Sequence, residues 1–179
     1  MSDILLHEVK DKTEIITFNN PEKLNVLSDR MLELLTKALE KASRNSETKV
    51  VIIKSTGKAF CAGHDLKEMQ KARNSSDKGL SYFKDLFHRC SKVMLAINKL
   101  PKPVIAEVQG IATAAGCQLV ATCDIAVASK NASFGVNGVN IGLFCSTPMV
   151  ALSRNISRKK TFEMLVTGDF LNAYQANEA

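Results

Sequence analysis

Three short, almost wholly apolar runs limit this chain to a small set of folds. They span residues 50–53 (VVII), 104–108 (VIAEV) and 124–128 (DIAVA). A run with little polar alternation is typical of a strand buried on both faces, as strands of parallel sheets are. We therefore expect a largely parallel sheet whose two faces are covered by other elements.

Helical patterns separate these runs. Residues 29–43 place Met31, Leu32, Leu35 and Leu39 on one face, and Ser28 precedes them as an N-cap. Further helices are predicted at 80–100, at 114–122 and at 161–166, and a strand pair at 4–9 and 13–18. Alternating strands and helices favour the α/β class, and the length of 179 residues favours one domain. A Gly-rich dinucleotide fingerprint is absent, so a nucleotide-binding doubly wound fold is not indicated.

The composition excludes several classes of protein. No apolar run reaches the roughly 18 residues of a membrane span, and the N-terminus lacks a secretory signal pattern. We expect a protein of the cytoplasm or mitochondrial matrix that is not secreted. The five cysteines are odd in number and irregularly spaced, which favours reduced, buried thiols. Three scattered histidines and no Cys-x-x-Cys pair make a metal site unlikely.

The net charge of +6 has two interpretations. One is ordinary solvated helix faces rich in lysine, and the other is attraction of a phosphate-bearing ligand. Direct nucleic-acid binding is disfavoured, because arginines do not cluster and aromatic residues make up only 6% of the chain.

Two segments carry the pattern of a site. In residues 58–69 (KAFCAGHDLKEM) a strand leads through a small-residue turn into a helix near Asp65. The backbone N–H groups of residues 63–66 would be unpaired at such a helix start, where negative charge is favoured. In residues 109–119 (QGIATAAGCQL) a strand again leads into a helix of tiny side chains, which allow close approach of a ligand. Each segment alone is an ordinary strand–turn–helix junction.

Several motifs in fixed order make the combination specific. They are FNNPEKLNVLS (18–28), the two segments above, CDIAVAS (123–129), ASFGVNGVNIGL (132–143) and EMLVTGDFLNAYQANEA (163–179). With them the chain resembles the crotonase superfamily, also called the enoyl-CoA hydratase/isomerase family. The resemblance implies an α/β, ClpP-like spiral of repeated ββα units that binds acyl-CoA thioesters. Coenzyme A would be part of the substrate, with no covalently bound cofactor.

The resemblance also assigns residues. The backbone N–H groups of His64 and Ala115 would form an oxyanion hole for the thioester oxygen, which gains negative charge as an enolate forms. Ligand contacts of the first segment would fall on Ala62, His64, Asp65, Leu66 and Lys67. A preceding turn that holds Lys23, Leu24 and Val26 would flank the adenine or pantetheine of coenzyme A.

Two departures put the usual reaction in doubt. Where hydratases of the family carry a pair of carboxylates, this chain has Gln118 and Gly138. An amide neither gives nor takes a proton at neutral pH, and general acid–base catalysis contributes roughly 10²–10⁴ per group. We therefore expect little or no ordinary hydratase activity. Enolate chemistry without these acids, such as decarboxylation or slow hydrolysis, is the alternative reaction.

Other groups and functions stay open at this point. The side chains of His64, Asn137, Asn140, Cys145, Asp124 and Glu107 could take part, although a structural role is the simpler interpretation of each. An active hydratase or isomerase of fatty-acid metabolism is one alternative function. A non-catalytic module that binds RNA or protein is another.

The resemblance finally bears on domain and assembly. Domains of the family continue past the EMLVTG region into helices that commonly complete the CoA site and the trimer interface. We expect residues 1–179 to form a single crotonase-like core without that helical part. A homotrimer or a dimer of trimers is the expected assembly.

Overall fold

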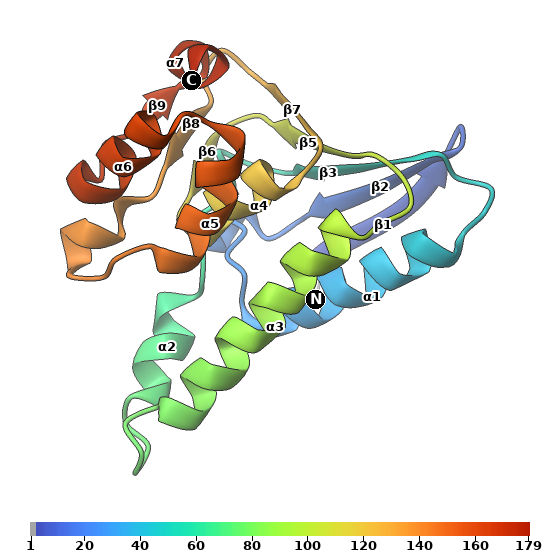
Figure 1. Cartoon of the computed structure of the whole chain (residues 1–179). Helices are drawn as coiled ribbons and strands as arrows, with labels where there is room; N and C mark the ends of the chain where they lie inside the picture. Colours follow the sequence, from blue (N-terminus) through green and yellow to red (C-terminus); the bar gives the residue numbers. More distant parts are fainter. Residues whose placement is uncertain (1–2) are drawn as a thin grey trace.

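The computed structural model describes residues 3–179, whose strands form two sheets (Figure 1). One sheet has the order β1-β2-β3-β5-β7 and the other the order β4-β6-β8-β9. The strands are β1 (Leu5–Lys10), β2 (Thr13–Phe18), β3 (Val50–Ser55), β4 (Ala59–Cys61), β5 (Val104–Val108), β6 (Ile111–Thr113), β7 (Ile125–Ala128), β8 (Ser133–Gly135) and β9 (Leu171–Asn172). The helices are η1 (Pro21–Lys23), α1 (Asp29–Arg44), α2 (Leu66–Ala72), α3 (Leu80–Asn98), α4 (Ala115–Thr122), η2 (Asn137–Ile141), α5 (Ser146–Asn155), α6 (Arg158–Thr167) and α7 (Ala173–Glu178).

The chain alternates regularly between the two sheets. Strands β3, β5 and β7 belong to the first sheet, and each is followed at once by β4, β6 or β8 of the second. Neighbours in each trio pair in parallel. Each strand pair leads into a helical segment, so the predicted α/β spiral of repeated ββα units is confirmed.

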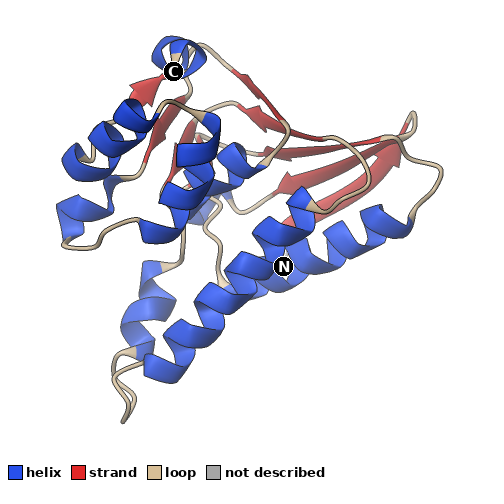
Figure 2. Cartoon of the chain, in the orientation of Figure 1, coloured by secondary structure: helices blue, strands red, loops and turns tan. Residues whose placement is uncertain are grey.

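The helices lie to one side of the first sheet and project beyond it (Figure 2). Helices α1 and α3 lie side by side, while α2 and the first half of α3 extend away from the body (Figure 1). The predicted N-cap of α1 is present, because the Met31 N–H donates to Ser28 Oγ over 3.2 Å. No helix within residues 3–179 is long and apolar enough to cross a membrane.

The expected burial of the apolar strands on both faces is wrong. Strand β3 alternates, with Val51 and Ile53 fully buried and their neighbours only half-buried. Strand β7 lies at the edge of its sheet, where Ile125 and Val127 are more than half exposed. Apolar composition alone does not tell a central strand from an edge strand whose outer surface is left uncovered.

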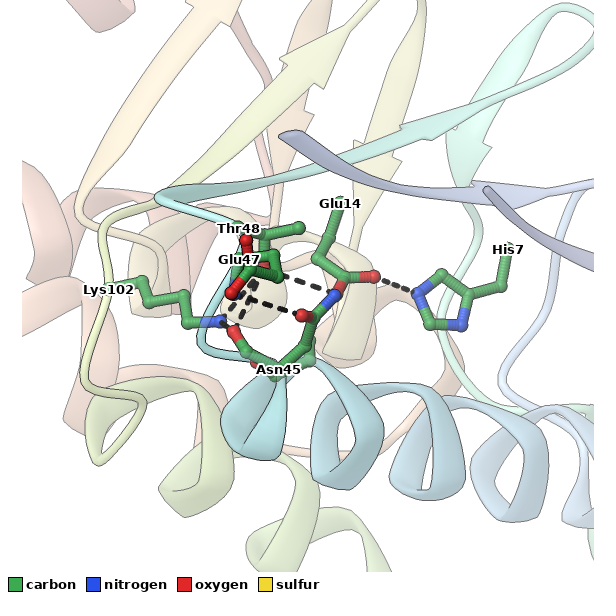
Figure 3. Close-up of polar contacts among 7 residues, drawn as sticks. His7, Glu14, Asn45, Glu47, Thr48 and Lys102 are labelled. Atoms are coloured by element: carbon green, nitrogen blue, oxygen red, sulfur yellow. Dashed lines mark hydrogen bonds and ion pairs between the residues drawn. The ribbon is translucent and has the colours of Figure 1, made fainter. Parts of the chain in front are cut away.

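A buried polar cluster ties the first sheet to the end of α1 (Figure 3). Glu14 of β2 is fully buried and accepts hydrogen bonds from Asn45 Nδ2 (2.7 Å) and Thr48 Oγ1 (3.2 Å), while His7 of β1 contacts its other oxygen. The Lys102 ammonium donates to Thr48 Oγ1 (2.8 Å) and to carbonyls at the end of α1. Burial opposes ionisation of Glu14, but its contacts with Asn45, His7 and Thr48 outweigh this effect and lower its pKa. The cluster lies at the opposite end of α1 from the segments considered next.

Candidate functional site

The two predicted site segments follow neighbouring parallel strands. Ala59 and Cys61 of β4 pair with Ile111 and Ala112 of β6, so both strands end at one edge of the second sheet. The helix that follows β6 lies against β4, since a Cβ at Gly116 would be only 2.1 Å from the Cys61 carbonyl oxygen. Only glycine permits this approach. The structure therefore brings the segments together as predicted.

The residue before each predicted oxyanion donor has an unusual backbone. Gly63, before His64, has φ +87°, and Ala114, before Ala115, has φ +51° and ψ −121°. Glycine adopts such angles readily, whereas in Ala114 they cost about 1–3 kcal/mol. Within residues 3–179, the N–H groups of His64 and Ala115 donate no hydrogen bond to the protein. Neither N–H group is therefore occupied by a hydrogen bond within the described part of the chain.

The side chain of Asp65 caps the helix that follows the first predicted donor. The Asp65 carboxylate caps α2, accepting from Lys67 N (2.9 Å) and Glu68 N (3.3 Å). These bonds satisfy the N–H groups of residues 67 and 68, which lie just beyond the predicted range of 63–66. The N–H of His64 lies in the turn at Gly63, before the helix begins.

The predicted coenzyme A turn lies directly beside the first segment. Ala62 N donates to Leu24 O (3.1 Å) and Leu27 N donates to Gly63 O (2.7 Å). Asn25 stabilises the turn. It is fully buried, and its side-chain amide donates to the carbonyls of Thr56 and Ala59, each over 2.8 Å. These bonds align the two segments of predicted ligand contacts.

The predicted contact residues differ in exposure. Lys23, Leu24, Leu66 and Lys67 are exposed and therefore accessible to a ligand. Ala62 and Val26 are half-buried. Asp65 is buried and occupied by its capping bonds, so its side chain positions α2.

The His64 imidazole packs against α3. Its ring meets Phe87 of α3 edge-on, with 5.8 Å between ring centroids. Burial lowers the pKa of His64, opposed in part by the nearby Leu27 carbonyl, so the ring is neutral at neutral pH. Its Nδ1 atom is buried and has no hydrogen-bond partner among residues 3–179.

Gln118 and Gly138, which are expected at the two acid positions, differ in their surroundings. Gln118 lies one helical turn after Ala115, is 7% exposed, and has a buried Oε1 atom without a partner. Gly138 is buried in η2, and a Cβ there would lie 2.4 Å from Leu143 O and 2.8 Å from Cys145 Sγ. The space that a side chain at position 138 would take is therefore filled by neighbouring residues.

The other candidate groups take structural positions. All five cysteines are free and buried, as expected, and burial raises the pKa of Cys61 and Cys117 to about 12 and also that of Cys145. Asp124 accepts from Val104 N (2.7 Å), and Glu107 is exposed on β5. Asn137 accepts from Thr113, and Asn140 is exposed. Within residues 3–179, no three His, Cys, Asp or Glu side chains gather as metal ligands.

Sequence reasoning missed a polar cluster beside His64. Asp29 accepts from Arg89 Nη2 (2.6 Å) and from the Tyr82 hydroxyl (3.3 Å), and its own N–H donates to Glu68 (2.8 Å). Burial raises the pKa of Glu68 and that of Tyr82, the latter to about 12. The cluster joins α1, α2 and α3. No local sequence motif predicts it, because its members are far apart in sequence.

Known proteins resemble this chain in sequence over nearly its whole length. The sequence profile of the enoyl-CoA hydratase/isomerase family matches residues 8–179. Enoyl-CoA hydratase domain-containing protein 3, mitochondrial, of Danio rerio is 48% identical over 98% of this chain, and its Homo sapiens counterpart is 49% identical over 90%. The chain spans 59% and 52% of the lengths of these two relatives.

Solved structures share the fold over nearly the whole chain. A crystal structure of an enoyl-CoA hydratase from Mycobacterium smegmatis superposes with a TM-score of 0.93 and 52% identity, covering 99% of this chain and 67% of the other. The structure of human enoyl-CoA hydratase domain-containing protein 3 gives a TM-score of 0.91 and 46% identity, covering 97% of this chain and 67% of the other.

Proposed function

The chain belongs to the enoyl-CoA hydratase/isomerase family, and from this premise we propose that it binds acyl-CoA thioesters with little ordinary hydratase activity. The thioester oxygen would accept hydrogen bonds from the N–H groups of His64 and Ala115. The observation that carries the proposal is that both donors are free and that each follows a residue with positive φ. Donors fixed in advance stabilise developing negative charge without reorganising.

Coenzyme A would lie along the turn that holds Lys23, Leu24 and Val26. The main-chain bonds between this turn and residues 62–63 support that placement, because they form one continuous edge beside the hole. Exposed Lys23 and Lys67 on either segment would attract the phosphates of coenzyme A.

The two acid positions support low hydratase activity. Gln118 cannot exchange a proton, and the side-chain space at Gly138 is taken by Leu143 O and Cys145 Sγ. Losing general acid–base groups lowers rates by roughly 10²–10⁴ each. A bound thioester could still be polarised, which leaves enolate reactions such as decarboxylation or slow hydrolysis within reach.

Isothermal titration tests the binding. We expect butyryl-CoA and free coenzyme A to bind, with butyryl-CoA the tighter ligand, and crotonyl-CoA to be hydrated at a negligible rate. Turnover near ordinary enzyme rates would favour the alternative of an active hydratase. Absence of acyl-CoA binding together with RNA affinity at physiological salt would favour an interaction module instead.

Assembly and location complete the proposal. Exposed apolar side chains on the last third of the chain, including Phe144, Phe162 and Tyr174, support association into trimers or dimers of trimers. The names of the Danio rerio and Homo sapiens relatives carry the word mitochondrial, which favours the mitochondrial matrix among the expected compartments. Analytical ultracentrifugation and cell fractionation test these two points.

A further inference from the structure

The conformation of Ala114 requires support from its surroundings. A non-glycine residue at φ +51° and ψ −121° persists only where neighbouring contacts hold it. Ala114 N donates to Gly135 O over 2.9 Å, and Ala114 O accepts the first bond of α4 from Gln118 N over 3.0 Å. These are ordinary strand and helix bonds, which also form around unstrained residues, so they do not by themselves select the strained angles of Ala114.

A side-chain contact supplies a further constraint. Thr113, just before Ala114, donates from its hydroxyl to Asn137 Oδ1 over 2.6 Å. Thr113 is the last residue of β6, and Asn137 opens η2 two residues after β8 ends. The contact therefore joins the end of one parallel strand to the segment that follows its neighbour, across the edge where the oxyanion hole lies.

We propose that Asn137 is a positioning residue that aims the Ala115 N–H into the oxyanion hole, acting through Thr113 and the strained backbone of Ala114. The inference rests on the proposed function, because it concerns the hole for the thioester oxygen. Without the Thr113–Asn137 bond, Ala114 can relax toward ordinary angles, and the following N–H then turns away from the ligand.

The test compares two ligands that differ only in the carbonyl oxygen. S-butyryl-CoA presents a thioester, and its thioether analogue S-butyl-CoA does not. We expect the wild-type chain to prefer the thioester by about tenfold, as two modest net hydrogen bonds would give. Asn137→Ala and Thr113→Val should each lower the preference to about twofold and leave the affinity for the thioether unchanged.

Matched variants separate positioning from folding. Thr113→Ser retains the hydroxyl and should retain the preference, and Asn131→Ala removes an exposed asparagine of the β7–β8 connection and should have no effect. If Asn137→Ala fails to fold, the Val and Ser variants of Thr113 decide the question alone. Ala114→Gly relieves the strain, so adding it to Asn137→Ala should restore the preference.

The outcomes distinguish the two proposals. A wild-type chain without preference for the thioester would contradict the proposed hole itself. A wild-type preference that survives in both Asn137→Ala and Thr113→Val would overturn the role of Asn137. Equal losses for thioester and thioether would show a merely structural contact and would overturn it as well. Failure of Ala114→Gly to restore the preference would overturn the route through Ala114.

Discussion

The Cβ of Ala114 lies 3.0 Å from the point where a Cβ of Gly63 would stand. The residues that precede the two proposed oxyanion donors are therefore packed against each other, and the Ala115 nitrogen is 3.4 Å from the same point. Two segments about fifty residues apart share one edge because their strands pair in parallel. This contact sets the spacing of the donors and links backbone geometry to the proposed binding of a thioester.

Gly138 should not accept a side chain. Gly138→Ala places a Cβ against Leu143 O and Cys145 Sγ, and such overpacking costs about 1–3 kcal/mol. Chemical denaturation measures this decrease in the free energy of unfolding. Gly142→Ala is the control, because a Cβ there meets nothing within 4 Å and only its φ of +75° imposes a cost of about 1 kcal/mol. If Gly138→Ala were as stable as the control, residues 143–145 would be able to move away from the new side chain at little cost.

The same contact bears on restoring hydratase activity. Gln118→Glu should fold and remain inactive toward crotonyl-CoA, because one carboxylate is still missing. Adding Gly138→Glu should destabilise the chain without restoring activity, since the second side chain has no space. An active double variant would contradict this view of the second acid position.

His64 should make stability depend on pH below neutrality. Burial lowers its pKa in the folded chain, whereas the unfolded chain titrates near about 6.5. The unfolded state then binds the extra proton first, so stability falls as the pH drops from about 6.5 toward the folded pKa. His64→Leu keeps the backbone N–H and should flatten this fall in denaturant titrations at several pH values. If wild type and His64→Leu lost the same free energy of unfolding over this pH range, the His64 ring would not be held neutral by the fold.

Glu14 should be important for folding rather than for binding. Glu14→Gln loses a buried carboxylate that accepts three side-chain hydrogen bonds (Figure 3), at a cost of about 3 kcal/mol. The folded pKa of Glu14 is lowered, so its contribution is complete above about pH 4.5 and is lost as the pH falls through the folded value.

The difference in the free energy of unfolding between wild type and Glu14→Gln should therefore become smaller as the pH falls below about 4.5. Exposed Glu8 of the neighbouring strand provides the control, since Glu8→Gln should change stability by no more than about 0.5 kcal/mol. A difference between wild type and Glu14→Gln that stays constant down to pH 3 would contradict the assigned role of the carboxylate.

The sequence predicts the elements that have strong local signals and misses those that depend on distant contacts. Ser28 and the spacing of Leu32, Leu35 and Leu39 predict α1 closely. Strands β8 and β9 and helix α5 were not predicted, because three- and two-residue strands and a weakly patterned helix have little local signal. Exposure of β7 depends on which strands flank it, and the sequence of β7 does not contain that information.

The site divides in the same way. Its residues at 62–67 and 113–118 follow from family motifs, but their geometry does not. The positive φ of Ala114 has no signature in a run of small residues, and the Thr113–Asn137 bond joins positions 24 residues apart. The filled space at Gly138 depends on how the chain returns from Leu143 to Cys145.

Backbone amide shifts of the isotopically labelled chain test the central claim most directly. On addition of S-butyryl-CoA, the amide protons of His64 and Ala115 should shift downfield as both donate to the thioester oxygen, and S-butyl-CoA should not produce this change. Shifts confined to the turn at Lys23, Leu24 and Val26, equal for both ligands, would mean that coenzyme A binds while the carbonyl is not held, which would contradict the account.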